Sequence, residues 1–186
     1  MTEPSNARQF SLQVLLRNGT PVLIRVLAPT DRDKIVAAFG KLDPESVYTR
    51  FFSFKKELSD VDLKRLEATD PGRSLALAAF VGSGPDETLI GAGSYVALPP
   101  ADGTRAAEVA FTIEEDYQGQ GLASRLFAAL AGIARQQGFT HLEAEVLAGN
   151  APMLAVFERS GLPLVKQKQG GVVHAVMDLG PTGEHA

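Results

Sequence analysis

The stretch from residue 108 to residue 133 constrains the fold most, because two different periodicities meet in it. Residues 108–113, Glu-Val-Ala-Phe-Thr-Ile, alternate as a strand with one buried face does. Apolar residues then recur at helical spacing, at Leu122, Leu126, Leu130 and Ile133. Between the two patterns lies Gln-Gly-Gln-Gly-Leu-Ala, residues 118–123. The sequence therefore predicts a strand, a short loop and a long helix in direct succession.

The loop at residues 118–123 has the properties of an anion-binding segment. Backbone N–H groups at the start of a helix have no intrahelical partner and lie at the positive end of its dipole. Because Gly119 and Gly121 have no Cβ, a phosphate can approach this backbone closely. The loop is not a P-loop, since no Gly-Lys-Ser/Thr follows, and it lacks the third glycine of the dinucleotide fingerprint. On spacing alone, a glycine turn that only begins a helix is the alternative.

The rest of the chain predicts an α+β fold. Strands are expected at residues 11–17, 22–27, 74–81, 89–98, 141–147, 162–168 and 172–178, with Asn18-Gly19 as the first hairpin turn. Helices are expected at residues 30–41, 46–52, 59–67, 121–137 and 150–160, with Thr30, Ser59 and Asn150 as N-caps. This order predicts a mostly antiparallel central sheet flanked by helices on both faces. No linker divides the chain, so we expect one domain over residues 1–186, with flexible tails at 1–9 and 179–186.

Two segments resemble motifs of the GNAT superfamily of N-acetyltransferases. Residues 108–123 resemble motif A, whose pyrophosphate loop Gln/Arg-x-x-Gly-x-Gly/Ala is matched by Gln118, Gly121 and Ala123. Residues 150–161, Asn-Ala-Pro-Met-Leu-Ala-Val-Phe-Glu-Arg-Ser-Gly, look like motif B, and the order of elements is similar from about residue 22 to residue 178.

A third segment resembles a narrower group. Residues 42–52 and 58–60 resemble the acetyltransferase domain of bacterial protein lysine acetyltransferases that modify acyl-CoA synthetases. The alternative for its aromatic residues is a helix that packs on the sheet through Tyr48, Phe51, Phe52 and Phe54.

The resemblance implies an acetyl-CoA-dependent N-acetyltransferase that acts on a primary amine, either a protein lysine or a small amine. A lysine-like amine has a pKa near 10.4 and is protonated at pH 7, so a carboxylate must accept its proton. Glu108 matches the general-base position of the superfamily, and Glu143 and Glu145 on the next predicted strand are reserve candidates. A surface ion pair is the alternative role for Glu108. A non-catalytic acyl-CoA-binding regulatory module is the alternative function.

The resemblance also assigns the acetyl-CoA site. The main chain of the strand end would hold the thioester and pantetheine, and the loop amides would hold the pyrophosphate: Phe111, Thr112, Ile113, Gln118, Gly119, Gln120, Gly121, Leu122, Ala123 and Ser124. Asn150 is expected to contact CoA, to cap its helix, or to do both. Phe157 occupies a position where many members have the tyrosine that protonates the departing thiolate, and phenylalanine cannot donate a proton.

Composition limits the other possibilities. The chain has no cysteine and its three histidines have no close ligand spacing, so we expect no metal. A net charge of −4 without a basic patch argues against nucleic acid as a partner. No apolar run approaches the roughly 20 residues of a membrane span, and we expect a cytoplasmic protein. By resemblance, helices in residues 29–70 and the hairpin at 163–173 build the acceptor site. Their side chains do not specify which acceptor binds there. Neither the acyl group that is preferred nor the oligomeric state follows from the sequence.

Overall fold

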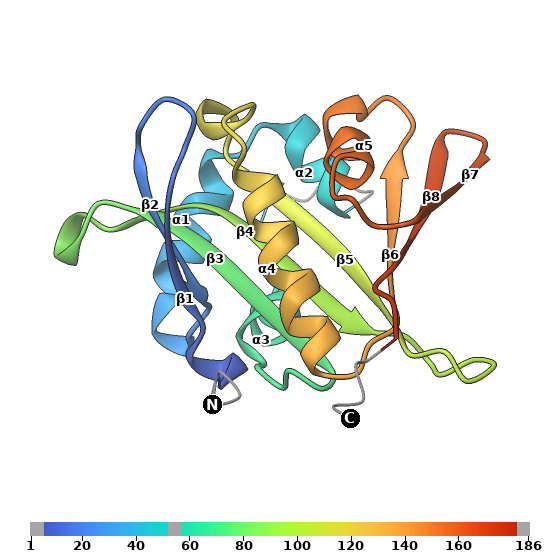
Figure 1. Cartoon of the computed structure of the whole chain (residues 1–186). Helices are drawn as coiled ribbons and strands as arrows, with labels where there is room; N and C mark the ends of the chain where they lie inside the picture. Colours follow the sequence, from blue (N-terminus) through green and yellow to red (C-terminus); the bar gives the residue numbers. More distant parts are fainter. Residues whose placement is uncertain (1–5, 52–56, 182–186) are drawn as a thin grey trace.

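The computed structural model of the chain describes residues 6–51 and 57–181 and contains one eight-stranded sheet with the strand order β1-β2-β3-β4-β5-β6-β8-β7 (Figure 1). Only the β5–β6 pair is parallel; the other neighbours are antiparallel. The strands are β1 (Ser11–Leu15), β2 (Pro21–Val26), β3 (Ser74–Val81), β4 (Thr88–Ala97), β5 (Ala106–Ile113), β6 (His141–Leu147), β7 (Leu164–Gln169) and β8 (Val172–Asp178).

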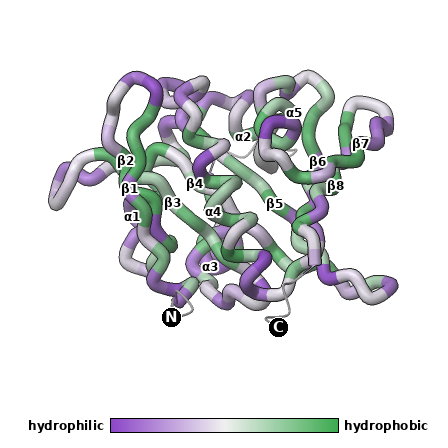
Figure 2. The backbone as a smooth tube through the Cα atoms, in the orientation of Figure 1, coloured by the Kyte–Doolittle hydropathy of each residue, from purple (hydrophilic) through white to green (hydrophobic). Residues whose placement is uncertain are grey.

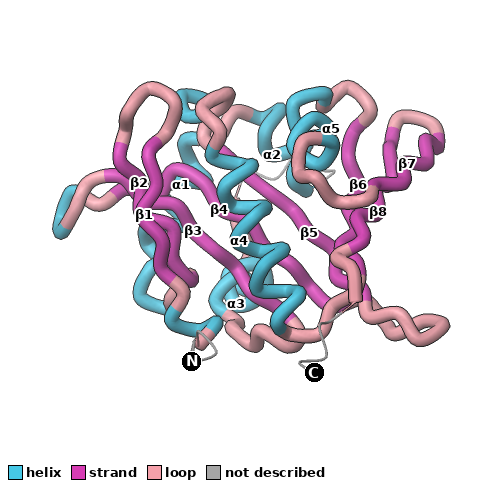
Figure 3. Tube along the Cα trace, in the orientation of Figure 1, coloured by secondary structure: helices cyan, strands magenta, loops and turns pink. Residues whose placement is uncertain are grey.

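Helices lie on both faces of the sheet (Figures 1 and 3). The long helix α4 crosses the front of β4 and β5, while the helices that precede β3 lie behind the sheet. The helices are α1 (Arg32–Lys41), α2 (Pro44–Phe51), α3 (Asp60–Glu67), α4 (Leu122–Gln136) and α5 (Ala151–Glu158). This arrangement confirms the predicted α+β fold class.

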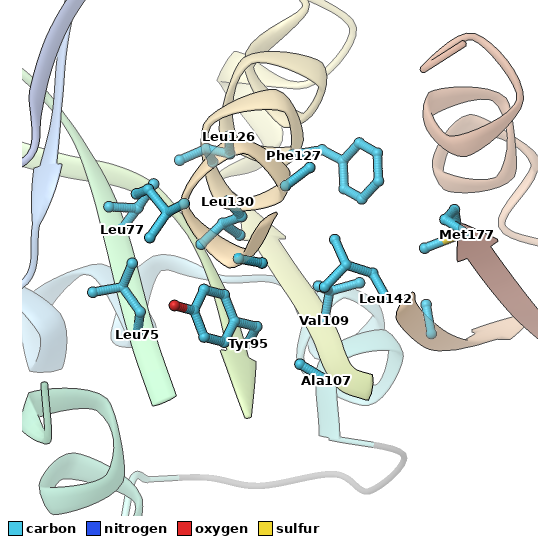
Figure 4. Close-up of a cluster of buried hydrophobic side chains, with 14 of the residues drawn as sticks. Leu75, Leu77, Tyr95, Ala107, Val109, Leu126, Phe127, Leu130, Leu142 and Met177 are labelled. Carbon is cyan, nitrogen blue, oxygen red and sulfur yellow. The ribbon is translucent and has the colours of Figure 1, made fainter. Parts of the chain in front are cut away.

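A large core fills the face covered by α4. Leu126 and Leu130 of α4 are fully buried against Leu77 of β3 and Val109 of β5 (Figure 4). On β4, Gly93 faces this core, and a Cβ there would lie 2.8 Å from the ring of Phe111. The glycine therefore lets the Phe111 ring lie directly over β4, and the hydrophobic band follows β3, β4, β5 and α4 (Figure 2).

A smaller core lies on the opposite face, beneath α1 and α3. Ile35 of α1 and Leu63 of α3 pack with Phe80 of β3. The start of α1 is held by Asp31, which is 2 % exposed and accepts hydrogen bonds of 2.7 and 2.8 Å from the guanidinium of Arg25. This guanidinium holds the pKa of Asp31 below its ordinary value, so the carboxylate stays charged inside the fold.

The parallel pair β5–β6 separates soon after it begins. Ala106 pairs with His141 and Glu108 with Glu143, but no residue of β5 beyond Glu108 pairs with β6 in the described part of the chain. Figure 1 shows the two strands diverging from this point. One edge of the C-terminal half of β5 is therefore left without a strand partner.

Most element positions agree with the sequence prediction, and the differences have local causes. Strands 74–81, 141–147 and 172–178 were predicted with their observed bounds. The prediction that Thr30 caps α1 is wrong: Thr30 lies in a 3-10 helix (Pro29–Asp31), and the Asp31 carboxylate accepts the Ala28 N–H instead. Phe52, the expected last residue of the second helix, and Phe54 lie outside the described residues.

The inner ends of the expected tails belong to the core. Ala7, in a 3-10 helix (Ala7–Gln9), is 7 % exposed, and Leu179 is 3 % exposed. Both side chains pack into the large core on the α4 face, so residues 7 and 179 are not tails, contrary to the sequence prediction. Ala7 is a single apolar residue next to a polar stretch, so no periodicity in the sequence predicts its packing.

Candidate active site

The loop before α4 presents a row of free backbone N–H groups. Gly121 is the N-cap of α4 with φ +89°, and Gly119 has φ +70°, a conformation that favours glycine. The N–H of Gln118 donates to the Glu115 carbonyl, and the N–H of Arg125 donates to the Gly121 carbonyl. Between these two, the N–H groups of residues 119–124 make no hydrogen bond within the described chain. The predicted anion-binding segment is thus available for a ligand from Gly119 to Ser124.

Two side chains fix the conformation of this loop. Gln118 donates through Nε2 to the Ile113 carbonyl at 3.0 Å, which ties the loop to the end of β5. Arg17, from the turn between β1 and β2, donates through its guanidinium to the Gly119 carbonyl at 3.1 Å, and its backbone N–H donates to the Gln120 carbonyl. Arg17 places an exposed cation beside the free amides. The sequence did not indicate this contact: Asn18-Gly19 predicts the turn, but 102 positions separate Arg17 from Gly119 and no pattern links the turn to the loop.

The free edge of β5 carries the main-chain groups expected to face a thioester. Leu98 donates to the Ala106 carbonyl and Glu114 donates to the Ile90 carbonyl, so the even-numbered residues between them direct their N–H and C=O groups at β4. The odd-numbered residues direct theirs at the open side. Of the three expected contacts, Phe111 and Ile113 therefore present N–H groups to the gap between β5 and β6, whereas the backbone of Thr112 faces β4.

Glu108 stands at the point where β5 and β6 separate, on the face opposite α4. Its exposed side chain makes no ion pair or side-chain hydrogen bond with any described residue. The reserve carboxylates differ: Glu143 lies 3.2 Å from Nε2 of His174, and Glu145 lies 2.6 Å from Nδ1 of the same ring. Of the three candidate bases, Glu108 is thus the one without a competing partner. The sequence did not reveal this difference, because it depends on the pairing of β6 with β8.

Helix α5 packs beside α4, near the open edge of β5 (Figure 1). Asn150 caps this helix, since its Oδ1 accepts the Met153 N–H at 3.2 Å, while its Nδ2 makes no hydrogen bond within the described chain. The Asn150 amide is therefore still free to donate to a ligand. Phe157 is 1 % exposed and packs against Phe127 and Phe111, with ring centroids 5.2 and 6.3 Å away. The position that carries tyrosine in many members is here part of an aromatic core.

The segment after β5 is tied to the start of α2. The Glu115 carboxylate accepts the Asp43 N–H at 3.0 Å and a hydrogen bond from Ser46. Burial alone would raise the pKa of Glu115, but these hydrogen bonds outweigh it and hold the pKa below its ordinary value. The connection places α2 close to the end of β5, on the same face as Glu108.

A hollow lies beside this end of β5, between the sheet and helices α1 and α3. Small side chains form its sheet wall: Ala76, Ala92, Ser94, Ala110 and Thr112. Apolar side chains form the opposite wall, among them Ile35, Ala38 and Leu66. Glu114, one residue beyond β5, is the single charged group among the described lining residues.

No group of three or more His, Cys, Asp or Glu side chains among the described residues is arranged to hold a metal ion. Among the helices of residues 6–51 and 57–181, none has the length and apolar character needed to cross a membrane.

Comparisons with known proteins agree with this geometry. The model of the acetyltransferase (GNAT) family matches residues 43–162. The chain is 33 % identical over 138 residues to acetyltransferase PA5475 from Pseudomonas aeruginosa, covering 74 % of this chain and 73 % of that protein. It is 29 % identical over 182 residues to acetyltransferase Pat from Mycolicibacterium smegmatis, covering 91 % of this chain but only 49 %, about half, of Pat.

Solved structures give the same result. The GNAT domain of S. lividans PAT matches with a TM-score of 0.81 and 30 % identity, over 95 % of this chain and 99 % of that one. The structure of yncA from Salmonella typhimurium with its cofactor acetyl-CoA matches with a TM-score of 0.66 over 89 % of this chain and 96 % of that one, but its 19 % identity shows a shared fold alone. The free loop amides, the open edge of β5 and the match over residues 43–162 together show that the chain belongs to the GNAT family of acetyltransferases and is an N-acetyltransferase.

Proposed function

We propose that the chain transfers an acetyl group directly from acetyl-CoA to a primary amine, with Glu108 as the general base. In this reaction a C–N bond forms, the C–S bond of the thioester breaks, and one proton leaves the amine. The acceptor is a small amine or a protein lysine. Residues 42–52 resemble protein lysine acetyltransferases, whereas the apolar lining of the hollow favours a small amine.

The unpartnered carboxylate of Glu108 carries this proposal. Supplying a neutral amine from an ammonium group of pKa about 10.4 at pH 7 costs roughly 4–5 kcal/mol. The reserve carboxylates both contact His174, Glu143 at 3.2 Å and Glu145 at 2.6 Å, whereas Glu108 has no competing side-chain partner among the described residues. Phe111 lies three residues beyond Glu108, about 10 Å along the strand, so the proton passes to Glu108 through one or more bridging waters.

Main-chain groups supply the remaining parts of the proposed site. The N–H groups of Phe111 and Ile113 are the donors available to the thioester oxygen and the pantetheine. The amides from Gly119 to Ser124 are the donors available to the pyrophosphate, with Arg17 as an added cation. Because a thiol of pKa about 8.5 is only about 1.5 pH units above neutral, its departure without a tyrosine acid costs at most roughly 2 kcal/mol. Phe157 is therefore compatible with catalysis.

The test is the Glu108→Gln variant, measured as thiol release from acetyl-CoA over a panel of amines. We expect kcat at pH 7 to fall about 100-fold or more, the range for a general base, and the KM for acetyl-CoA to change less than threefold. Activity should recover at higher pH, because more of the amine is then neutral. The matched control is Glu145→Gln, a carboxylate of similar exposure on the same face, which should keep most of the activity. A pH–rate profile unchanged by Glu108→Gln would remove Glu108 from the mechanism.

A further inference from the structure

The hollow beneath α1 and α3 adjoins the proposed reaction centre on the acceptor face. Glu108, Ala110 and Thr112 alternate along β5 on one face, and the latter two line the hollow. An amine beside the free edge of β5, within reach of Glu108 through water, therefore has this hollow next to it. The hollow results from small side chains on β3, β4 and β5, whereas Phe80, farther along β3, fills the same face elsewhere.

The chemistry of the lining distinguishes possible occupants. Hydrocarbon side chains from α1 and α3 face the alanines of the sheet, and burying apolar groups there is favourable. The charged group in the lining is the Glu114 carboxylate, which makes no ion pair or side-chain hydrogen bond with any described residue. A carboxylate beside an apolar surface complements a cation that carries a hydrocarbon group. A neutral acyl chain gains nothing from Glu114, and an anionic substrate is repelled by it.

We propose that this hollow binds the hydrocarbon part of the acceptor, so that the preferred acceptors are small primary amines with an alkyl chain or ring of several carbons. This inference rests on the proposed function and specifies its substrate class. Glu114 attracts the ammonium form, and the amine nitrogen remains on the Ala110–Thr112 side of the hollow, nearest the thioester. A lysine within a polypeptide fits less well, because the far end of its side chain must continue into a polar backbone.

The first experiment compares n-alkylamines from ethylamine to hexylamine, whose amino groups have nearly equal pKa values. We expect kcat/KM to rise about threefold with each methylene, or roughly 50- to 100-fold over the series. Nα-acetyl-lysine methylamide provides the peptide-like acceptor. A flat series, or a better kcat/KM for the lysine derivative than for hexylamine, would overturn the proposal.

The second experiment fills the hollow. Ala38 lines the hollow, while Ala37 on the same helix is exposed. The variants Ala38→Leu and Ala37→Leu make the same change in helix propensity, so they differ only in whether the added side chain enters the hollow. Ala38→Leu should lower the hexylamine-to-ethylamine ratio about tenfold, and Ala37→Leu should leave the ratio within twofold. If Ala38→Leu does not fold, as judged by circular dichroism, Ala38→Val is the smaller replacement. Equal effects at both positions would contradict the assignment.

Two further measurements separate this inference from the proposed function. If Ala38→Leu reduces the use of butyryl-CoA relative to acetyl-CoA and leaves the amine preference intact, the hollow holds the acyl chain and the proposal is wrong. Thermal unfolding of the CoA-loaded protein with each amine reports binding without turnover. Hexylamine should raise the Tm more than ethylamine, and Ala38→Leu should abolish the difference. If Glu108→Gln does not reduce activity, the role of Glu108 as general base is refuted. The amine-binding measurements do not depend on that role and test the hollow separately.

Discussion

The donor side and the acceptor side of β5 offer different kinds of groups to a ligand. On the donor side, the groups offered to a ligand are backbone amides, at the edge of β5 and in residues 119–124, and Phe111, Phe127 and Phe157 pack a closed aromatic core behind them. On the acceptor side, the groups are side chains around a hollow. A main-chain site depends on local conformation and tolerates many sequences, whereas a side-chain site changes with each substitution. We therefore expect family members to share the donor side and to differ on the acceptor side.

The largest expected effect comes from blocking the donor side at Gly121. The Gly121→Glu variant puts a Cβ and a negative charge where the pyrophosphate is proposed to bind, and like charges in contact cost several kcal/mol. Calorimetry should show CoA affinity reduced about 100-fold or more, with the fold intact by circular dichroism. Gly103→Glu is the control, because Gly103 also has positive φ and open space but lies beyond the opposite end of β5. Normal CoA affinity in folded Gly121→Glu would contradict the loop assignment.

A smaller effect compares the packing of the two faces. Leu130 on α4 is completely buried in the closed core, whereas Leu89 on β4 is 8 % exposed and borders the hollow. Leu130→Ala should cost about 3–4 kcal/mol of unfolding free energy, because it leaves a new cavity. Leu89→Ala should cost about 2 kcal/mol, because space beside it already exists. Urea unfolding measures both values, and equal costs would show that the hollow is packed as well as the α4 core.

The smallest effect concerns Arg17, the cation beside the loop. Its exposed guanidinium contacts the Gly119 carbonyl, and an exposed charge contributes at most about 1 kcal/mol. Arg17→Met should weaken CoA binding about three- to fivefold and reduce the dependence of binding on salt. Arg8→Met, at another exposed arginine near the N-terminus, should leave both quantities unchanged. If Arg17→Met binds CoA as tightly as the unmodified chain does, Arg17 does not contribute to CoA binding.

Sequence patterns predicted the strand, the loop and the helix of the donor side because their determinants are local. The alternation of residues 108–113, the glycines of the loop and the helical spacing that follows lie next to one another in the chain. The same holds for the buried strand at 74–81, where a continuous apolar run set the observed bounds. The resemblance singled out Glu108 as the expected general base, with Glu143 and Glu145 in reserve, but it did not reveal that His174 contacts both reserve carboxylates.

The acceptor side was not predictable for a physical reason. The hollow is formed by small residues on β3, β4 and β5, and no single segment shows that Ala76, Ser94 and Ala110 lie side by side. The contact of Arg17 with Gly119 likewise arises from the position of the β1–β2 turn. Which backbone groups of β5 face the gap depends on its register with β4, which favours Phe111 and Ile113 over Thr112.

Backbone amide NMR spectra with and without CoA test the division between donor and acceptor sides most directly. The amides of Phe111, Ile113 and residues 119–124 should show the largest chemical-shift changes, since their N–H groups are free in the unliganded protein. The amides of Ala38 and Leu66 on the far wall of the hollow should change little with CoA and respond instead to hexylamine. Large CoA-induced changes around the hollow, with residues 119–124 unaffected, would contradict the account.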